Sequence, residues 1–249
     1  MQSQTAVVDR VLCLASVWIL GSVAAAVRTR VSGDGQDLML PAVRAWLGDE
    51  GLEARLSPHE RALVAGRVED WSRRDITDAN WRAESIGTLL WALSSIDALP
   101  PYDREFAQPV DGVPMFGPTA GFRAAARLRD ADTIGRARIV AELWQWRSRT
   151  RRLVADPDQE TQQAGLDLAA VARQTATMAH AKGYIPAPIE GDFPALGKAY
   201  GALDGDEYAH VTSIACERHH ALCWLCRSSD DWDAGPSAPA RPVALRRRA

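Results

Sequence analysis

The segment at residues 78–98, DANWRAESIGTLLWALSSIDA, constrains the fold most, because it is apolar on nearly every side of a helix. Its apolar positions are Trp81, Ala83, Ile86, Leu89, Leu90, Trp91, Leu93 and Ile96. A helix that is apolar all round must be covered by other elements. Pro100 and Pro101 follow, and proline cannot continue a helix. The sequence therefore predicts a buried central helix near 78–98.

The rest of the chain also has mainly helical patterns, and strand alternation is nearly absent. Further helices are expected at residues 6–30, 41–48, 58–69, 120–130, 132–155, 158–181 and 204–227. Ser57, Pro58 and Glu60 form a helix-start pattern, with a capping hydroxyl, a proline at the first position and a capping-box glutamate. We predict an all-α, single-domain irregular bundle of about seven to nine helices over residues 1–232, followed by a disordered Pro/Ala/Arg-rich tail, 233–249.

One long connection interrupts the helices, at residues 183–207 (GYIPAPIEGDFPALGKAYGALDGDE). Its prolines and glycines favour turns over a helix or a strand. We expect it to lie on the surface, held there by Tyr184, Ile185, Phe193 and Leu196.

Composition limits the classes of partner. The net charge of the 249 residues is −3, and a cluster of arginines lies in the tail, so the body does not predict general affinity for nucleic acid. Cys216, Cys223 and Cys226 lie too close together for a disulfide framework, which favours a reducing, cytoplasmic location. Lysine occurs only at Lys182 and Lys198 among 29 basic residues, a bias that indicates a bacterial genome rich in G and C.

The N-terminal segment has two interpretations. Residues 11–27, VLCLASVWILGSVAAAV, carry no charge and end in small residues, as a signal peptide cleaved near Ala26 would. However, Asp9 offsets Arg10, no basic region precedes them, and the segment is short for a membrane span. We favour a buried first helix and expect no membrane span; the alternative is a secreted protein that has lost residues 1–26.

Two charged residues are predicted to meet in the core. Glu84 lies inside the central helix, and Arg218 lies in the middle of an apolar helical stripe. That stripe consists of Val211, Ile214, Ala215, Ala221, Leu222 and Leu225. A guanidinium does not lose its proton and needs acceptors, so we predict that Arg218 is buried and bonded to Glu84. The pair either fixes helix register in a filled core or clamps an anion at a site.

The stretch IACERHHALCWLCR, residues 214–227, raises the question of a metal. Cys216, His220 and Cys223 are spaced i, i+4 and i+7, so that one helix could present them to zinc. Glu217 and His220 also match one half of a di-iron motif. The sequence has no second cluster of cysteines or histidines, so we expect no metal and no cofactor, with the thiols packed as small apolar groups.

A tryptophan–arginine pattern occupies residues 143–154, LWQWRSRTRRLV. The side expected to face the core carries Ile139, Leu143, Trp146, Thr150 and Leu153. A second face carries Trp144, Arg147 and Arg151, which could stack on a base and clamp a phosphate. The alternative is that these arginines pair with acidic residues of their own fold and stack on aromatic rings.

Three blocks of the sequence together resemble a bacterial family. They are NWRAESIGTLLWAL, LWQWRSRTRRL and GDFPALGKAYGALDGDEYAHVTSIACERHHALCWLC followed by WD. The resemblance is to domain of unknown function 4272, and it extends from the first helix to about Trp232. The last block is the most specific. Cys223 stands where the family pattern has asparagine and Cys216 where it has methionine, which weakens the metal hypothesis. The resemblance implies no activity.

Three functional hypotheses remain open. The leading one is a non-catalytic helical protein that binds another protein, as an adaptor, accessory or immunity factor. The second is an enzyme or a binder of small anions, in which Glu84 or Glu217 is the base, His219 or His220 the proton shuttle, and Arg218 the anion clamp. The third is nucleic-acid binding by the tryptophan–arginine face. A cavity or a filled core at Arg218 discriminates between the first two.

Overall fold

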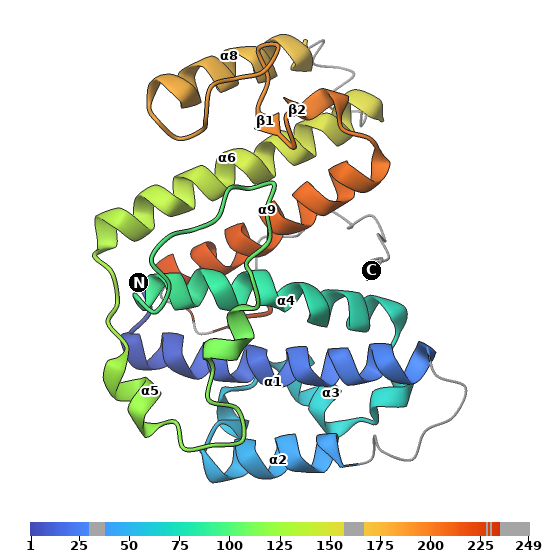
Figure 1. The fold of residues 1–249 in the computed structure, drawn as a ribbon, viewed down its shortest axis with the longest axis vertical. Coiled ribbons are helices and arrows are strands. Elements are labelled where there is room, and N and C mark those ends of the chain that lie inside the picture. The colour runs from blue at the N-terminus through green and yellow to red at the C-terminus, as the bar shows by residue number, and fades with distance from the viewer. Residues whose placement is uncertain (30–37, 157–166, 228, 230, 235–249) are drawn as a thin grey trace.

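The computed structural model describes residues 1–29, 38–156, 167–227, 229 and 231–234, and this part forms one all-α bundle with a single small hairpin (Figure 1). Its α-helices are α1 (Gln4–Thr29), α2 (Met39–Asp49), α3 (Pro58–Ala65), α4 (Arg73–Ala92), α5 (Ala120–Ala125), α6 (Ala131–Ala155), α8 (Leu168–Ala181) and α9 (Gly205–Cys226). Short 3-10 turns are η1 (Glu53–Arg55), η2 (Val68–Asp70), η3 (Pro109–Gly112) and η4 (Tyr200–Ala202). The hairpin pairs β1 (Pro194–Ala195) with β2 (Lys198–Ala199) in antiparallel register.

Helix α4 is the predicted central helix, and its side chains are continuously buried from Glu84 to Ala92. The predicted bounds were wrong, because the helix spans 73–92 rather than 78–98. It begins earlier because Ser72 and Asp75 form a capping box that the hydrophobic pattern did not reveal. It ends earlier because Ser94 has a left-handed backbone conformation, six residues before the first proline.

The other helices also follow their predicted positions, although α3 and α5 end earlier than predicted and α2 is longer. The Ser57–Glu60 capping box that was predicted does start α3, but this helix stops at Ala65 instead of residue 69. Helix α5 covers only the first half of the predicted 120–130 segment. Residues 157–166 lie outside the described part, so the predicted start of a helix at 158 is not tested. Most of the predicted tail, from residue 235, is likewise outside it.

The helices pack in an ordered series across the molecule. In Figure 1, α1 and α4 run side by side near the middle, α9 and α6 lie beyond α4, and α8 lies beyond α6. Helices α2 and α3 cover the opposite side of α1. Gly21 permits the close approach of α1 and α4, since a Cβ at this position would lie 2.5 Å from the Cβ of Ala79. Helix α4 is therefore enclosed between α1 and α9.

Helix α1 is a core helix in this fold, as predicted. By length and composition it could cross a membrane, but 61% of its most apolar window is buried inside the structure. Its two charged residues near the start are also used internally: Arg10 bonds Glu60 of α3 at 2.5 Å, and Asp9 bonds Arg123 of α5 at 2.5 Å. These ion pairs connect α1 to elements distant in sequence.

The connection at 183–207 runs over the surface as predicted, since most of its residues are exposed or half-exposed, and a few buried side chains anchor it. Phe193 and Tyr200 are fully buried, and Ile185 is buried as well, whereas Leu196 is exposed at the tip of the hairpin. An ion pair between Arg147 of α6 and Asp192 also fastens this connection, and the neighbouring Phe193 packs against Trp144.

Candidate functional site

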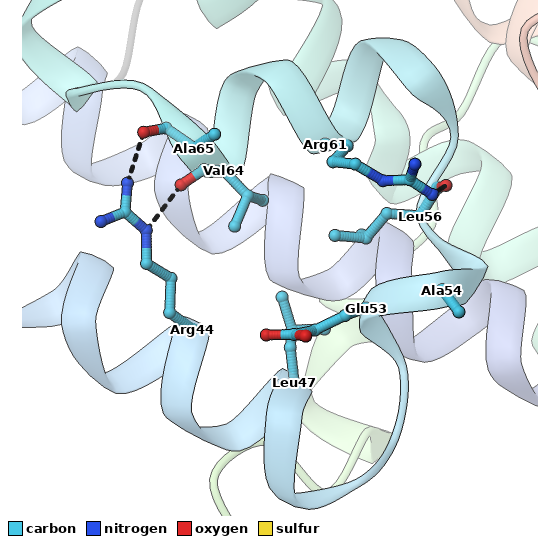
Figure 2. Close-up of a pocket in the computed structure, with 8 residues that line it drawn as sticks. All are labelled: Arg44, Leu47, Glu53, Ala54, Leu56, Arg61, Val64 and Ala65. Carbon is cyan, nitrogen blue, oxygen red and sulfur yellow. Dashed lines mark hydrogen bonds between the residues drawn. The ribbon is translucent and has the colours of Figure 1, made fainter.

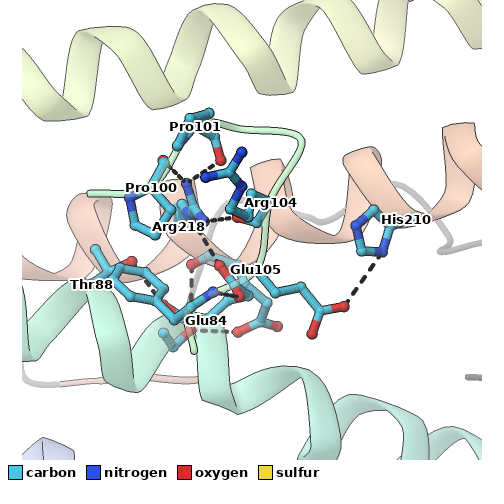
Figure 3. Close-up of polar contacts among 11 residues, drawn as sticks. Glu84, Thr88, Pro100, Pro101, Arg104, Glu105, His210 and Arg218 are labelled. Atoms are coloured by element: carbon cyan, nitrogen blue, oxygen red, sulfur yellow. Dashed lines mark hydrogen bonds and ion pairs between the residues drawn. The ribbon is translucent and has the colours of Figure 1, made fainter. Parts of the chain in front are cut away.

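Arg218 and Glu84 form the predicted buried ion pair between α9 and α4 (Figure 3). The Arg218 Nε atom donates to Glu84 Oε2 at 2.9 Å, and the exposed fractions of the two side chains are 0% and 1%. The pair joins α4 and α9, which pack against each other.

The remaining donors of Arg218 bind the loop that follows α4. Its Nη1 atom donates to the carbonyl of Pro100 at 2.6 Å and of Pro101 at 3.2 Å, and its Nη2 atom donates to that of Arg104 at 2.7 Å. The guanidinium also lies between the rings of Tyr102 and Phe106, about 5 Å from each centroid. All three nitrogens are thus engaged, and Arg218 faces a filled core.

Glu84 is equally occupied. Its second oxygen accepts the backbone N–H of Phe106 at 2.9 Å. Burial raises the pKa of Glu84 above its ordinary range, although the charge of Arg218 and the amide of Phe106 act in the opposite direction. Gly87, one turn along α4, leaves room for the Phe106 ring, since any Cβ there would collide with it. The Arg218–Glu84 pair thus bonds the loop at 100–106 to α4 and α9. We call this set of contacts the latch.

The other candidate acid, Glu217, lies in a different environment. The Ser85 hydroxyl donates to its carboxylate, and Arg82 lies 3.7 Å away. Both partners come from α4, and Glu217 is completely buried. Glu84 therefore bonds Arg218 and the loop at 100–106, whereas Glu217 bonds side chains of α4.

The two adjacent histidines also point to different partners. His219 Nε2 lies 3.2 Å from Cys223 Sγ, whereas the His220 ring packs edge-on against Trp232, with centroids 4.4 Å apart. Cys216 is buried. Among the residues that the structure describes, no group of three or more His, Cys, Asp or Glu side chains could hold a metal ion. The contact of Cys223 is with His219, not with the His220 of the hypothetical metal site.

The tryptophan–arginine face is bonded within the fold. Arg147 donates through Nε and Nη2 to Asp192, at 2.7 and 2.6 Å, and Arg151 donates to the carbonyls of Tyr200 and Leu203. Trp144 is buried and stacks on Tyr102, with the rings 6° from parallel. Arg147 follows the alternative interpretation, since it pairs with Asp192 and its charge is buried, whereas Arg151 bonds carbonyls instead of an acidic residue.

The predicted core side of α6 was wrong. Ile139 is 38% exposed, while the face with Trp144, Arg147 and Ser148 is buried against α9 and the 183–207 connection.

Arg147 also changes the pKa of its partner Asp192. Burial works to raise the pKa of Asp192, but hydrogen bonds from Arg147, its charge, and the amides of Gly201 and Phe193 outweigh burial and lower that pKa.

A protein-family model described as "Domain of unknown function (DUF4272)" matches residues 1–178. The chain belongs to the DUF4272 family. The matched part contains α4 and α6 and ends within α8, so the α9 block, taken above as the most specific part of the resemblance, lies beyond it. No curated protein and no solved structure matches the chain.

One hollow in the described part of this DUF4272 chain was not predicted. It has a volume of about 510 Å³ and lies between α2, η1 and α3 (Figure 2). Its apolar surface comes from Leu47, Leu56 and Val64, which are buried side chains of three different elements. We call this hollow the α2–α3 groove. All of its lining residues lie within 44–65, but the groove depends on how α2, η1 and α3 fold against one another, which the sequence pattern did not reveal.

The rim of the α2–α3 groove is charged and exposed. Arg44 donates to the carbonyls of Val64 and Ala65 at 2.7 and 2.8 Å and so caps the end of α3 (Figure 2). Arg61 and Glu53 lie on the other sides of the groove. None of the candidate residues Glu84, Glu217, Arg218, His219 or His220 lines it.

The burial of Trp232 is a second feature that was not predicted from the sequence. Its side chain is fully buried, and Arg10 of α1 and Arg82 of α4 lie over its ring at 5.3 and 5.7 Å. The rings of His220 and Trp224 on α9 pack against it. A smaller hollow of about 260 Å³ lies beside it. Trp232 therefore joins three helices, although nothing in the local sequence indicates burial.

Proposed function

We propose that this protein acts without catalysis, by binding another protein in the α2–α3 groove. The observation that supports this most is the filled core around Arg218, where every guanidinium nitrogen bonds the protein itself. A catalytic or anion-binding cluster needs polar atoms that remain available to a ligand. Of the candidate residues, Glu84 and Arg218 hold α4, α9 and the loop at 100–106 together.

The α2–α3 groove has the composition of an interface core. An apolar floor of Leu47, Leu56 and Val64 is surrounded by charged groups, as in many protein-binding surfaces. Two arginines, Arg44 and Arg61, and one glutamate line the rim. The partner that fits is a segment of another protein that inserts apolar side chains and carries carboxylates beside them, because these would pair with the excess positive charge.

We also propose a cytoplasmic location. All four cysteines are free thiols, which suits a reducing compartment. The burial of α1 against α4, with Arg10 bonded to Glu60, gives this helix a role inside the fold. Detection of Met1 at the N-terminus of the protein purified from its own cells would support this proposal, and a mature N-terminus near Ala26 would contradict it.

Photocrosslinking in living cells tests the groove. Ala54 and Ala65 line it and are exposed, so either can be replaced by a photoreactive amino acid with little effect on the core. Ala169, exposed on α8, is the matched control position. We expect both groove positions to capture the same protein, the control to capture none of it, and Ala65→Trp, which fills the groove, to abolish capture from Ala54.

Two results would contradict the proposal. One is capture of the same proteins from Ala169 as from Ala54 and Ala65, since this would show only random contact. The other is a folded Ala65→Trp variant, with unchanged circular dichroism, that still crosslinks from position 54 with full yield. Crosslinking of a true partner must therefore depend on the α2–α3 groove.

A further inference from the structure

The last turns of α9 place a thiol against an imidazole. Cys223 Sγ lies 3.2 Å from His219 Nε2, and the two residues are four apart on one helix, which fixes their relative position. A thiol donates its proton weakly, and a neutral imidazole accepts through its unprotonated nitrogen. When the thiol donates in this contact, Nε2 is the acceptor and the ring proton is on Nδ1.

Electrostatics keep both partners neutral near pH 7. Burial lowers the pKa of His219 and raises the pKa of Cys223. Nearby charges act in both directions: Glu142 of α6 raises the pKa of His219 and Arg138 lowers it, while Arg138 and Arg227 lower the pKa of Cys223 and Cys226 and Glu142 raise it, and burial remains the largest cause for both groups. A neutral thiol that donates to a neutral base is the arrangement in which a base removes the proton as the sulfur attacks.

Access distinguishes this thiol from the two cysteines deeper in the fold. Cys223 and Cys226 are partly exposed, whereas Cys13 and Cys216 are buried. Neither hollow described above is lined by His219, Cys223 or Cys226. A small reactant suits a half-buried thiol of this kind better than a large substrate.

A second thiol lies one turn further along. Cys226 is the last residue of α9, and Arg227 after it is extended. Residues i and i+3 of a helix have Cβ atoms about 5–6 Å apart, while a disulfide brings them to about 3.8 Å. Cys226 can close this difference if only the final turn opens, because no helical residue follows it.

We propose that Cys223 is an oxidation site for hydroperoxides, with His219 as its base and Cys226 as the thiol that completes a disulfide. This modification is separate from partner binding in the α2–α3 groove. The protein reacts with one equivalent of hydroperoxide and is not a catalyst in this step.

The reaction balances in two steps. His219 takes the Cys223 proton as the sulfur attacks the peroxide, so that an S–O bond forms, the O–O bond breaks, and the departing oxygen takes the proton back as an alcohol or water. Cys226 then attacks the sulfenic sulfur. An S–S bond forms, the S–O bond breaks, and water leaves with the Cys226 proton. The peroxide is reduced by two electrons and the two thiols are oxidised.

The test treats the full-length native protein with hydrogen peroxide and maps the products by mass spectrometry. We expect a sulfenic adduct at Cys223 with a dimedone trap in the Cys226→Ser variant, and a Cys223–Cys226 disulfide without the trap in the native sequence. Cys13 and Cys216 serve as internal controls and should stay reduced. His219→Gln, which keeps a polar side chain but removes the base, should slow Cys223 oxidation by roughly tenfold or more.

Several outcomes would overturn the proposal. Dimedone labelling of Cys226 in a Cys223→Ser variant as fast as that of Cys223 in the Cys226→Ser variant would remove any special role for His219. An unchanged rate in a folded His219→Gln variant would do the same. A stable sulfenic acid at Cys223 in the native sequence, without the disulfide, would overturn the role of Cys226.

Discussion

At the scale of single residues, Arg218 carries a permanent charge in a place without solvent, and it is tolerated because Glu84 and three carbonyls surround it. Removing one partner of such a pair leaves the other charge buried without compensation. We expect Arg218→Ala to lower the free energy of unfolding by about 3–5 kcal/mol. Arg218→Lys should also be strongly destabilising, because an ammonium cannot reach the same four acceptors.

Urea unfolding followed by circular dichroism measures this effect. Arg149→Ala is the matched control, since Arg149 is exposed on α6, and it should change the stability by less than about 0.5 kcal/mol. An Arg218→Ala variant as stable as this control would show that the latch contributes nothing. A folded Arg218→Ala variant that lost a bound ligand would instead favour the anion-clamp hypothesis.

The ion pair of Asp192 with Arg147 should make the stability of the fold depend on pH. Its pKa is lower in the folded protein than in the unfolded chain, so its pairing with Arg147 stabilises the fold above the unfolded pKa of about 3.9 and is lost as the pH falls through the folded value. We expect Asp192→Asn to cost about 1.5–3 kcal/mol at pH 7. The difference from the native protein should shrink below about pH 4, as measured by urea unfolding at each pH. A constant difference across this range would contradict the assignment.

At the scale of elements, α4 depends on a glycine that ordinary helix propensity would replace. Alanine is favoured over glycine inside a helix by about 1 kcal/mol. At Gly87, however, a Cβ would collide with the buried Phe106 ring, which lies against Arg218. Overpacking costs about 1–3 kcal/mol, so Gly87→Ala should be destabilising on balance.

Gly135→Ala is the matched control for this prediction. Gly135 lies inside α6 and has nothing near its potential Cβ, so the same substitution should raise the melting temperature there. Thermal unfolding of the two variants should therefore show shifts of opposite sign. If both variants are stabilised, the 100–106 loop can move away from α4 without cost, and the latch is weaker than its contacts indicate.

At the scale of the whole molecule, Trp232 connects the end of the described chain to α1, α4 and α9. Replacing a buried tryptophan by alanine typically costs about 3–5 kcal/mol. We expect this cost for Trp232→Ala, and a smaller one for Trp146→Ala, because Trp146 is only half-buried. Since Trp232 contacts three helices of one bundle, unfolding should remain a single transition by both fluorescence and circular dichroism. A separate early transition in the native protein would contradict a single cooperative unit.

Local patterns in the sequence predicted a substantial part of this structure. The apolar surface of α4 required burial, the Ser57–Glu60 box started α3, and the charge of Arg218 required an acceptor that Glu84 supplied. Helix ends were less accurate, because capping residues such as Ser72 and the backbone at Ser94 act over a single turn and override hydrophobic periodicity.

The sequence by itself determined the helical class and the need to pair a buried arginine, because helix periodicity and the cost of burying a charge are local properties of the residues. Only the tertiary structure decided which face of α6 is buried, that Glu217 bonds side chains of α4, and that Trp232 joins three helices. It also decided the α2–α3 groove and the contact of His219 with Cys223. These features depend on packing between elements and on side-chain rotamers, which no short pattern in the chain encodes.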